Sequence, residues 1–587
     1  MSLLRPLLFS ALAVAVPAAS DAEGNGRSAS SRPKPGWIRT ASVHDPSVFR
    51  DTNGKYYIVG THLASASSDN LISWSQTDTL RNSLSPEAIG KIRAWNKDEK
   101  ARNWFDYLWA PDIIYNRRMR KYCIYLSANG DDWKSNIVLL TSDKVTGPFE
   151  YAGSVVYGGF TPEDWEQTDV PKVLGAKTLP GRYVANGVRN GKWGLAFPNC
   201  IDPCVFYDAT GKLWMSYGSW SGGIFLLALD GATGLRDQRI KYPLNNHSDP
   251  YFGTKIAGGS YASGEGSYIK RIGGWYWLFM SYGKLEARGG YNVRVFRSRR
   301  PDGPYLDKNG NTPFYDTYRK NFNEGTGVRL FGAYKWGANR SGMVAQGHNS
   351  AIVDDDGRAY IVYHTRMDEG HEWHYIRIHQ LFLNRDGWLL AAPFRTRGER
   401  LDPKGLPKES VCGDWDLILH KMDVDYARLG GARPERVALN ADGTISGART
   451  GRWSLDAGTP YITIAIDGVD TFRGVALTVA VDETNDKTPG FTAIGDKTQL
   501  TLWGARDVGG KPSQRTATWF SPRWPRVCIS CSFPLPHFTD EDAFCDLDSP
   551  PVGLKLPRTA TWFSPGGMKP CSEPWTQLMD FLPRIAL

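Results

Sequence analysis

The segment at residues 45–61 reads DPSVFRDTNGKYYIVGT and has the pattern of a β-hairpin. Its first part is a short apolar strand, its middle is a polar turn with a glycine, and its last part is an aromatic-rich strand. Apolar runs on both sides of such a turn are the usual sequence signal of a hairpin. We therefore predict two antiparallel strands here, with Asp45 at the start of the first.

The same pattern recurs four more times along the chain. The copies are DIIYNRRMRKYCIYLSA at 112–128, DPCVFYDATGKLWMSYGS at 202–219, EGSYIKRIGGWYWLFMSYG at 265–283 and HNSAIVDDDGRAYIVYHT at 348–365. A glycine stands nine residues after the first residue of each copy except the second, which has Lys121 there. The first residues are 67, 90, 63 and 83 positions apart, which suits four-stranded units with long loops.

Five such units predict an all-β fold with a five-bladed β-propeller over residues 37–400. The innermost strand of each propeller blade starts near the central axis. The first residues of the copies are therefore expected to face one shared cavity: Asp45, Asp112, Asp202, Glu265 and His348. A β-sandwich of repeated hairpins is the alternative, but it gives no reason for ionisable residues to share this register.

A second β domain is predicted at residues 401–507, where YITIAIDG at 461–468 and FRGVALTVAVDE at 472–483 alternate with turn signals. We expect a C-terminal barrel-like or sandwich-like domain. It carries Trp453 and Trp503 but no recognisable catalytic set, so packing against the propeller is its expected role in preference to independent sugar binding.

Both ends of the chain are expected to lie outside these domains. Arg5, the apolar stretch 7–16 and the small residues at 18–20 predict a signal peptide over residues 1–20, followed by a flexible lead-in at 21–36. We therefore expect a secreted, extracellular protein. At the other end, RTATWFSP at 515–522 recurs at 558–565 without a regular period. Residues 508–587 are interpreted as an irregular tail, disordered or produced by a faulty gene model.

Composition narrows the possible partners. Lys and Arg number 70 against 61 Asp and Glu, a net charge of +9 without a long basic run, so no nucleic-acid partner is predicted. No other apolar run approaches the length of a membrane span, so no membrane partner is predicted. The 22 Trp, 27 Tyr and 24 Phe residues offer flat faces that can stack on sugar rings.

Several carboxylates and a histidine around one axial pocket suit either acid–base chemistry or a cation site. Hydrolysis of a glycosidic bond needs one protonated acid and one ionised carboxylate. Like charges and partial burial raise the pKa of one carboxyl and leave the other ionised. The axial residues therefore suit hydrolysis of a glycosidic bond, with a cation site as the other interpretation.

Five short motifs, in order and over some 360 residues from Ile38 to about Arg397, resemble those of glycoside hydrolase family 43. They are His44-Asp45-Pro46, Trp109-Ala110-Pro111-Asp112, Ile201-Asp202-Pro203, Gly264-Glu265-Gly266 and Gly347-His348-Asn349. The resemblance implies an inverting mechanism with Asp45 as general base, Glu265 as general acid and Asp202 as the carboxylate that orients the acid and holds up its pKa. It also implies that His348 approaches a cation on the axis, usually calcium.

Within that family the chain is most similar to extracellular two-domain endo-α-1,5-L-arabinanases. This similarity rests on two features. One is the segment that follows Gly347, and the other is Tyr217-Gly218-Ser219-Trp220 followed by Gly222-Gly223-Ile224. The resemblance implies a monomer that cuts inside arabinan chains. The candidate substrate-binding residues are His44, Trp109, Asn199, Ser219 and Trp220.

Two alternatives stay open at this point. One is an exo-acting α-L-arabinofuranosidase or β-xylosidase of the same family, because loop shape separates an open groove from a closed pocket. The other is a non-catalytic carbohydrate-binding propeller whose carboxylates only hold a cation. The related retaining fructan hydrolases are disfavoured because the chain has no Trp-Met-Asn-Asp-Pro segment near its start.

Cys200 and Cys204 bracket Asp202, where the family rarely has cysteines. In an extended segment they would lie on the face of Asp202, about 13 Å apart. That separation is too large for a disulfide. We therefore expect two free thiols beside the pocket.

Overall fold

The structure is a computed structural model that describes residues 40–77, 79–96, 103–130, 133–262, 264–315, 317, 325–421 and 429–508. The expected signal peptide, lead-in and irregular tail lie outside these residues, apart from Val508. The described residues all fall in one compact unit.

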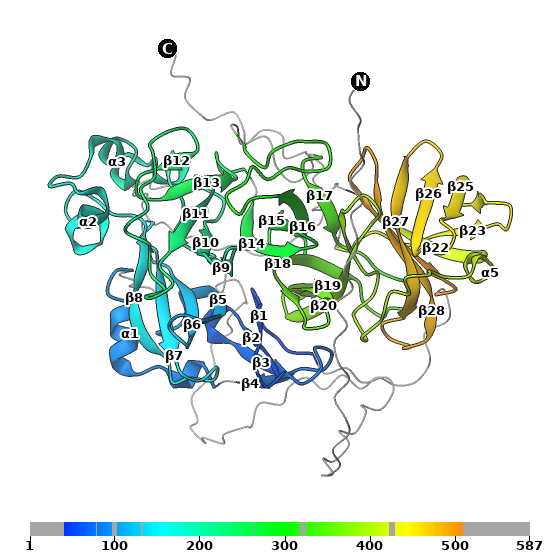
Figure 1. Cartoon of the computed structure of the whole chain (residues 1–587), viewed down its shortest axis with the longest axis horizontal. Helices are drawn as coiled ribbons and strands as arrows, with labels where there is room; N and C mark the ends of the chain where they lie inside the picture. Colours follow the sequence, from blue (N-terminus) through cyan, green and yellow to red (C-terminus); the bar gives the residue numbers. More distant parts are fainter. Residues whose placement is uncertain are drawn as a thin grey trace, which may run out of the picture. The chain divides into compact units, whose positions relative to one another are not determined.

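Five antiparallel sheets form the first part of the described chain, and Figure 1 shows them in order from blue to green. The first sheet holds β1 (Ser47–Arg50), β2 (Tyr56–Val59), β3 (Ser65–Ser68) and β4 (Ser75–Thr77). The second holds β5 (Leu108–Asn116), β6 (Lys121–Ala128), β7 (Asn136–Ser142) and β8 (Glu150–Tyr157). The third holds β9 (Cys204–Tyr207), β10 (Leu213–Tyr217), β11 (Ile224–Leu229), β12 (Ser248–Asp249) and β13 (Gly253–Ala257). The fourth holds β14 (Glu265–Ile272), β15 (Trp275–Tyr282), β16 (Asn292–Ser298) and β17 (Val328–Phe331), and the fifth β18 (Met343–Val353), β19 (Ala359–Met367), β20 (His374–Leu383) and β21 (Leu389–Ala391).

These sheets are the blades of a five-bladed propeller, which confirms the predicted fold class. The hairpin turns follow the sequence pattern closely. Gly54, Gly211, Gly274 and Gly357 all have φ between +81° and +86°, a left-handed conformation that glycine adopts without strain. In the second blade Arg120 takes the left-handed position, with φ of +58°, one residue before Lys121.

The helices of the described chain are short and lie in the connections. They are η1 (Thr61–Leu63), η2 (Arg81–Ser83), α1 (Pro86–Ile92), η3 (Trp165–Gln167), α2 (Val170–Leu174), α3 (Gly181–Ala185), η4 (Val188–Asn190), α4 (Trp193–Ala196) and α5 (Lys408–Val411). Of the helices in the described ranges, none has the length and apolar character needed to cross a membrane.

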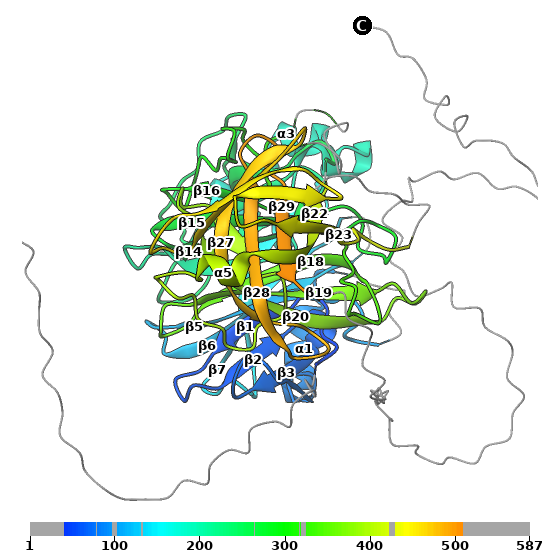
Figure 2. The same ribbon diagram turned by 90° about the vertical axis from the view of Figure 1, so that its right-hand side faces the viewer.

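The C-terminal strands close into an eight-stranded antiparallel barrel, as the predicted second β domain requires. The strands are β22 (Gly413–His420), β23 (Glu435–Leu439), β24 (Thr444–Gly447), β25 (Gly451–Leu455), β26 (Tyr461–Ile466), β27 (Asp470–Ala480), β28 (Lys487–Gly495) and β29 (Thr501–Arg506). Figure 2 shows β27, β28, β29 and β22 side by side. Trp415, Trp453 and Phe491 fill the barrel interior.

The barrel packs against the fourth and fifth blades through apolar side chains. Trp503 of β29 is fully buried in one cluster with Phe331 and Trp388, and its Nε1 donates to the carbonyl of Ala391 at 3.0 Å. Trp453 is also buried and donates to the carbonyl of Asn440. Both indoles are buried, and the barrel packs against the propeller as expected.

A buried charge cluster adds to this contact. Asp482 follows β27, and its side chain is 1% exposed. It accepts from the backbone N–H of Arg395 at 3.0 Å and pairs with the guanidinium of Arg377 at 3.4 Å. Burial alone would raise the pKa of Asp482, but Arg395, Arg377 and Arg397 lower it to about 2. The carboxylate therefore stays ionised between the two domains.

We expect Asp482→Asn to lower the free energy of unfolding at pH 7 by about 3 kcal/mol, because buried arginines lose their counter-charge. A pKa lower in the folded than in the unfolded chain stabilises the fold above about pH 4, and this stabilisation is lost as the pH falls through 2. In the parent protein it amounts to about 2 kcal/mol. Urea unfolding at pH 7, 4 and 2 measures both quantities.

Asp456→Asn is the matched control, because Asp456 pairs with Arg385 across the same contact but at the exposed surface. Exposed pairs contribute about 1 kcal/mol or less. Equal losses in the two variants would contradict the role given to Asp482.

The prediction for the two cysteines was partly wrong. Both thiols are free and buried. Asp202 has φ of +56°, however, so the chain is not extended between them. Cys200 packs with Tyr217 in one apolar cluster, and Cys204 packs with Ile269 in another. Burial raises the pKa of both thiols, which keeps them protonated and unreactive.

Candidate active site

Asp45 lies just before β1, at the inner end of the first blade. Its backbone is left-handed, with φ of +51°, and the residue is 8% exposed. Backbone strain of this kind is concentrated at functional sites. Oδ2 accepts a hydrogen bond from the hydroxyl of Thr61 at 2.5 Å. The carboxylate is thus held by a residue at the end of its own hairpin.

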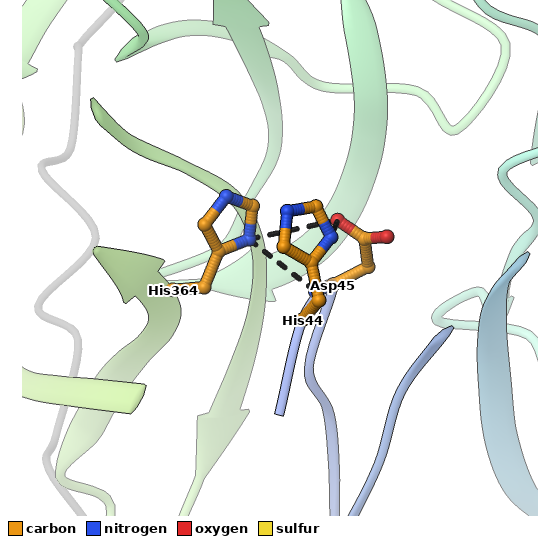
Figure 3. A group of neighbouring side chains, drawn as sticks. All are labelled: His44, Asp45 and His364. Carbon is orange, nitrogen blue, oxygen red and sulfur yellow. Dashed lines mark hydrogen bonds and ion pairs between the residues drawn. The ribbon is translucent and has the colours of Figure 1, made fainter. Parts of the chain in front are cut away.

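Three imidazole rings surround the other oxygen of Asp45. Its Oδ1 lies 2.8 Å from Nδ1 of His44, 3.2 Å from Nδ1 of His348 and 3.5 Å from Nδ1 of His364 (Figure 3 draws His44, Asp45 and His364). Burial alone would raise the pKa of Asp45, but His348, His44 and His364 lower it well below its usual range. Asp45 is therefore an ionised carboxylate at neutral pH.

One hydrogen-bonding pattern recurs at four of the five junctions between neighbouring blades. A side chain near the end of the second strand of a blade accepts the backbone N–H of a left-handed residue in, or just before, the first strand of the next blade. The pairs, acceptor first, are Thr61 with Ala110, Ser127 with Asp202, Ser281 with His348, and His364 with Asp45. The last pair joins the fifth blade to the first, so His364 closes the ring.

Asp202 is buried beside the same axis. It is 6% exposed, and Oδ2 lies 3.4 Å from the backbone N–H of Gly266, which donates to it. Burial raises the pKa of Asp202; His348 opposes this, while Glu265 and Asp45 raise it further, to about 7. Asp202 therefore takes up a proton far more readily than Asp45, which stays ionised.

Glu265 begins β14 and receives three hydrogen bonds. Oε2 accepts from the hydroxyl of Ser219 at 2.9 Å and from Nε1 of Trp220 at 2.7 Å, and Oε1 accepts from the hydroxyl of Tyr291 at 2.7 Å. Gly266, the next residue, has φ of +55°, and a Cβ there would come within 2.9 Å of the His348 ring. The Glu-Gly pair therefore allows the carboxyl and the imidazole to approach.

His348 lies between these acids. Burial lowers the pKa of His348, but Asp45, Asp202 and Glu265 together raise it above the usual value. The arrangement thus has one ionised carboxylate, one carboxyl with a raised pKa and one carboxyl fixed by hydrogen bonds around an imidazole with a raised pKa. Carboxyl groups whose environments separate their protonation states are suited to general acid–base catalysis.

Asp112 was expected in this cavity, and that expectation was wrong. The residue of β5 that matches Asp45, Asp202 and His348 in its left-handed backbone and bonded N–H is Ala110, two positions before Asp112. The carboxylate of Asp112 instead accepts from the hydroxyl of Ser47 and from the backbone N–H of Val205, both at 2.5 Å. Burial raises its pKa to about 6, opposed by these hydrogen bonds. Through these two hydrogen bonds Asp112 connects the second blade to the first and the third.

The five candidate substrate-binding residues have different surroundings. Ser219 and Trp220 contact Glu265, and His44 contacts Asp45 and stacks on His364 with ring centroids 3.9 Å apart. Trp109 is half-buried and donates to the carbonyl of Asp106. The amide oxygen of Asn199 is buried and has no hydrogen-bond partner among the described residues.

Sequence reasoning missed Thr61, Ser127, His364 and Tyr291. A signal for three of these exists in the repeats, because a hydroxyl or imidazole recurs near the end of the second strand of the hairpin. Tyr291 had no such signal, since it immediately precedes the third strand of its blade, outside the repeated segment.

A metal ion could be held by His44, Asp45 and His364, whose potential ligand atoms lie within 4.8 Å of one another. Two observations argue against this cluster as a calcium site. Nδ1 of His364 already accepts the N–H of Asp45 at 3.3 Å, and the rings of His44 and His364 are stacked. In-plane lone pairs of stacked rings converge poorly on one ion. Calcium, moreover, prefers oxygen ligands, of which this cluster offers only a carboxylate.

Comparison with known proteins agrees with this geometry. A sequence model of "Glycosyl hydrolases family 43" matches residues 38–170 and 160–389, which include every blade. The chain belongs to glycoside hydrolase family 43. It is therefore a glycoside hydrolase, and the resemblance inferred from the five motifs is confirmed. A second model, of a C-terminal lipocalin-like domain, matches residues 393–504, which form the barrel.

Named relatives of this family 43 protein include two endo-acting enzymes. The extracellular endo-α-(1→5)-L-arabinanase 2 of Bacillus subtilis is 35% identical over 73% of this chain and 86% of its own length. The extracellular endo-α-(1→5)-L-arabinanase of Thermotoga petrophila is 34% identical over 80% of this chain and 94% of its own. A crystal structure of the Thermotoga enzyme superposes with a TM-score of 0.67 at 33% identity, covering 81% of this chain and all of the other.

An exo-acting relative is more distant. The extracellular exo-α-(1→5)-L-arabinofuranosidase ArbA of Cellvibrio japonicus is 27% identical over 60% of this chain and 86% of its own length.

Proposed function

We propose that this protein is an endo-acting α-1,5-L-arabinanase with an inverting mechanism. The observation that carries the proposal is the set of three carboxyl groups around His348, held in different environments in a family 43 propeller. The substrate follows from the endo-arabinanase relatives, which match both domains of the chain at 34–35% identity. The exo-acting relative is 27% identical and matches 60% of the chain, so it supports the alternative less.

In this proposal each carboxyl group has one role. Asp45, ionised and held by Thr61, is the general base that takes a proton from water as it attacks the anomeric carbon. Glu265 is the general acid that protonates the leaving oxygen. Asp202 adjusts the proton affinity of Glu265 and the orientation of the Glu265–Gly266 segment through the hydrogen bond from Gly266. The attack and the departure occur on opposite sides of the sugar, which inverts the anomeric configuration.

The substrate is proposed to bind beside these groups. His44 and Trp109 would contact the sugar next to the cleaved bond, and the unpartnered amide oxygen of Asn199 can accept a sugar hydroxyl. Ser219 and Trp220 would meet substrate while they hold Glu265.

Product analysis on debranched linear arabinan tests the proposal. We expect a spread of short arabino-oligosaccharides from early time points and little release from aryl arabinofuranoside or aryl xyloside. Monosaccharide as the sole product would favour the exo-acting alternative, and no product from any of the three substrates would favour a binding propeller. Proton NMR of the first product fixes the anomeric outcome, and retention would contradict the inverting mechanism.

We also propose that a calcium ion acts on the axis beside His348. The carboxyl groups that act on His348, above all the ionised Asp45, supply negative charge that favours a cation. The neutral imidazole of His348 would be its protein ligand there, and water would complete its shell, since calcium prefers oxygen. When bound, the ion would supply fixed positive charge near the reacting sugar.

Removing calcium is expected to lower kcat on arabinan by roughly tenfold, equivalent to about 1.4 kcal/mol. Dialysis against a chelator followed by metal analysis and assay measures this, and added calcium should restore the rate while added magnesium should not. The variant His348→Gln should lose the response. Unchanged activity after chelation, with no metal in the purified protein, would refute the ion.

Extracellular action is part of the same proposal. The relatives named above are described as extracellular, and the signal peptide predicted at residues 1–20 fits that location. Recovery of the full-length protein inside expressing cells, with none in the medium, would contradict it.

A further inference from the structure

We propose that Tyr291 is a positioning residue for the general acid, which it holds by Oε1 so that this oxygen faces the leaving group with its proton. The inference rests on the proposed role of Glu265. It begins with the 2.7 Å hydrogen bond from the Tyr291 hydroxyl to Oε1 of Glu265. The other two donors, Ser219 and Trp220, both contact Oε2.

The two oxygens of Glu265 therefore differ in their capacity to hold a proton. A carboxylate oxygen has about two lone-pair sites. On Oε2 both are used, one by the Ser219 hydroxyl and one by the Trp220 N–H, and an indole N–H can only donate. Among the described residues, Oε1 accepts from Tyr291, and its second lone pair is left for a proton. The proton delivered to the leaving oxygen therefore resides on Oε1.

The ring of Tyr291 lies in a slot formed by Gly347 and His364 of the fifth blade. A Cβ added at Gly347 would come within 2.1 Å of the Tyr291 ring, so only glycine leaves room for the ring at this point. Gly347 has no left-handed φ, so the ring and not the backbone explains the glycine. On another side the ring of His364 stacks at 5.9 Å with an interplanar angle of 18°.

This slot connects the two catalytic carboxyl groups. His364 accepts the backbone N–H of Asp45 and stacks on the ring of Tyr291. Tyr291 in turn donates a hydrogen bond to Glu265. Burial and the charges of Glu265 and Asp45 raise the pKa of Tyr291 far above neutrality, so its hydroxyl keeps its proton and donates. The base and the acid are therefore held to one another through two packed rings.

The variant Tyr291→Phe keeps the ring in the slot and removes only the donor. We expect kcat to fall roughly 10- to 100-fold on aryl α-1,5-arabinotriosides with poor leaving groups, because the lost hydrogen bond would stabilise the charge that Glu265 acquires as it gives up its proton. With a strongly activated aryl leaving group, which needs no proton, kcat should stay within about twofold. KM should change little for every substrate in this series. A leaving-group dependence equal to that of the parent enzyme would overturn the proposal.

Two comparisons separate this inference from the proposed function. Tyr282→Phe is the control, since Tyr282 is a buried tyrosine of the same blade whose hydroxyl contacts Tyr315 at 2.7 Å. It should leave the leaving-group dependence unchanged. If Glu265→Gln shows full activity, the acid assignment itself fails. If Glu265→Gln is impaired on poor leaving groups while Tyr291→Phe behaves as the parent, only the role of Tyr291 fails.

The slot has its own test in a double-mutant cycle. Gly347→Ala should push the ring aside and lower kcat on poor leaving groups at least as much as Tyr291→Phe. In a Tyr291→Ala background the added methyl meets no ring, so Gly347→Ala should then have little further effect. Additive losses would show that Gly347 does not act through Tyr291. Circular dichroism of each variant verifies that the propeller is folded.

Discussion

Replacing Asp45 by Asn is expected to lower kcat on linear arabinan by about 10²–10⁴-fold, the usual contribution of a positioned general base. The side chain keeps its size, and its oxygen can still accept from the Thr61 hydroxyl at the 2.5 Å contact. What disappears is the negative charge that His348, His44 and His364 stabilise. An amide cannot take a proton from water, so the chemical step fails while the pocket remains.

The substitution Asp45→Asn should therefore lower turnover and leave substrate binding nearly unchanged. Titration calorimetry with arabino-oligosaccharides should give a dissociation constant within a few-fold of that of the parent enzyme. Asp51→Asn is the control, because Asp51 lies at the far end of β1, where it accepts from the hydroxyl of Tyr122. That variant should turn over arabinan normally. Normal turnover by Asp45→Asn would instead remove Asp45 from the mechanism.

The variant Glu265→Gln is expected to show the second large effect, and its size should depend on the leaving group. On arabinan, whose leaving alkoxide needs a proton, kcat should fall by about 10²–10⁴-fold. On arabinotriosides with strongly activated aryl groups the loss should be small. The amide oxygen can still accept from Trp220 or from Tyr291, so the segment before β14 should keep its place.

A plot of log kcat against the pKa of the leaving phenol measures this dependence directly. The slope should be steeper for Glu265→Gln than for the parent enzyme. Glu87→Gln provides the control, since Glu87 forms an exposed pair with Lys91 on α1 at 2.7 Å. Equal slopes in the parent and in Glu265→Gln would mean that another group protonates the leaving oxygen.

The repeated hairpins could be predicted from the sequence because they depend on residues that are close together in the chain. Gly54, Gly211, Gly274 and Gly357 mark the turns, and the structure gives all four the left-handed backbone that glycine favours. The alternation of apolar residues in 461–466 of β26 predicted a strand of the second domain in the same way. Local signals of this kind led to the correct blade number and to the barrel.

The axial positions were only partly readable, because a count from the turn does not show which residue adopts the left-handed backbone at the axis. The count placed Asp112 with Asp45 and Asp202, yet in β5 that backbone belongs to Ala110, and the carboxylate of Asp112 contacts Ser47 and Val205. The straight geometry assumed between Cys200 and Cys204 failed for a related reason. The left-handed backbone of Asp202 turns their side chains into different apolar clusters.

By itself, the sequence determined the all-β class, the five blades, the second domain and the order of the motifs that carry Asp45, Asp202 and Glu265. Those features depend on residues close together in the chain. Only the tertiary structure decided which groups surround each carboxyl. His364 contacts Asp45, and Tyr291 stacks on His364, across boundaries between blades. Asp45 and His364, for example, are 319 residues apart in the chain. Protonation state depends on burial and neighbouring charge, and both arise only when the ring closes.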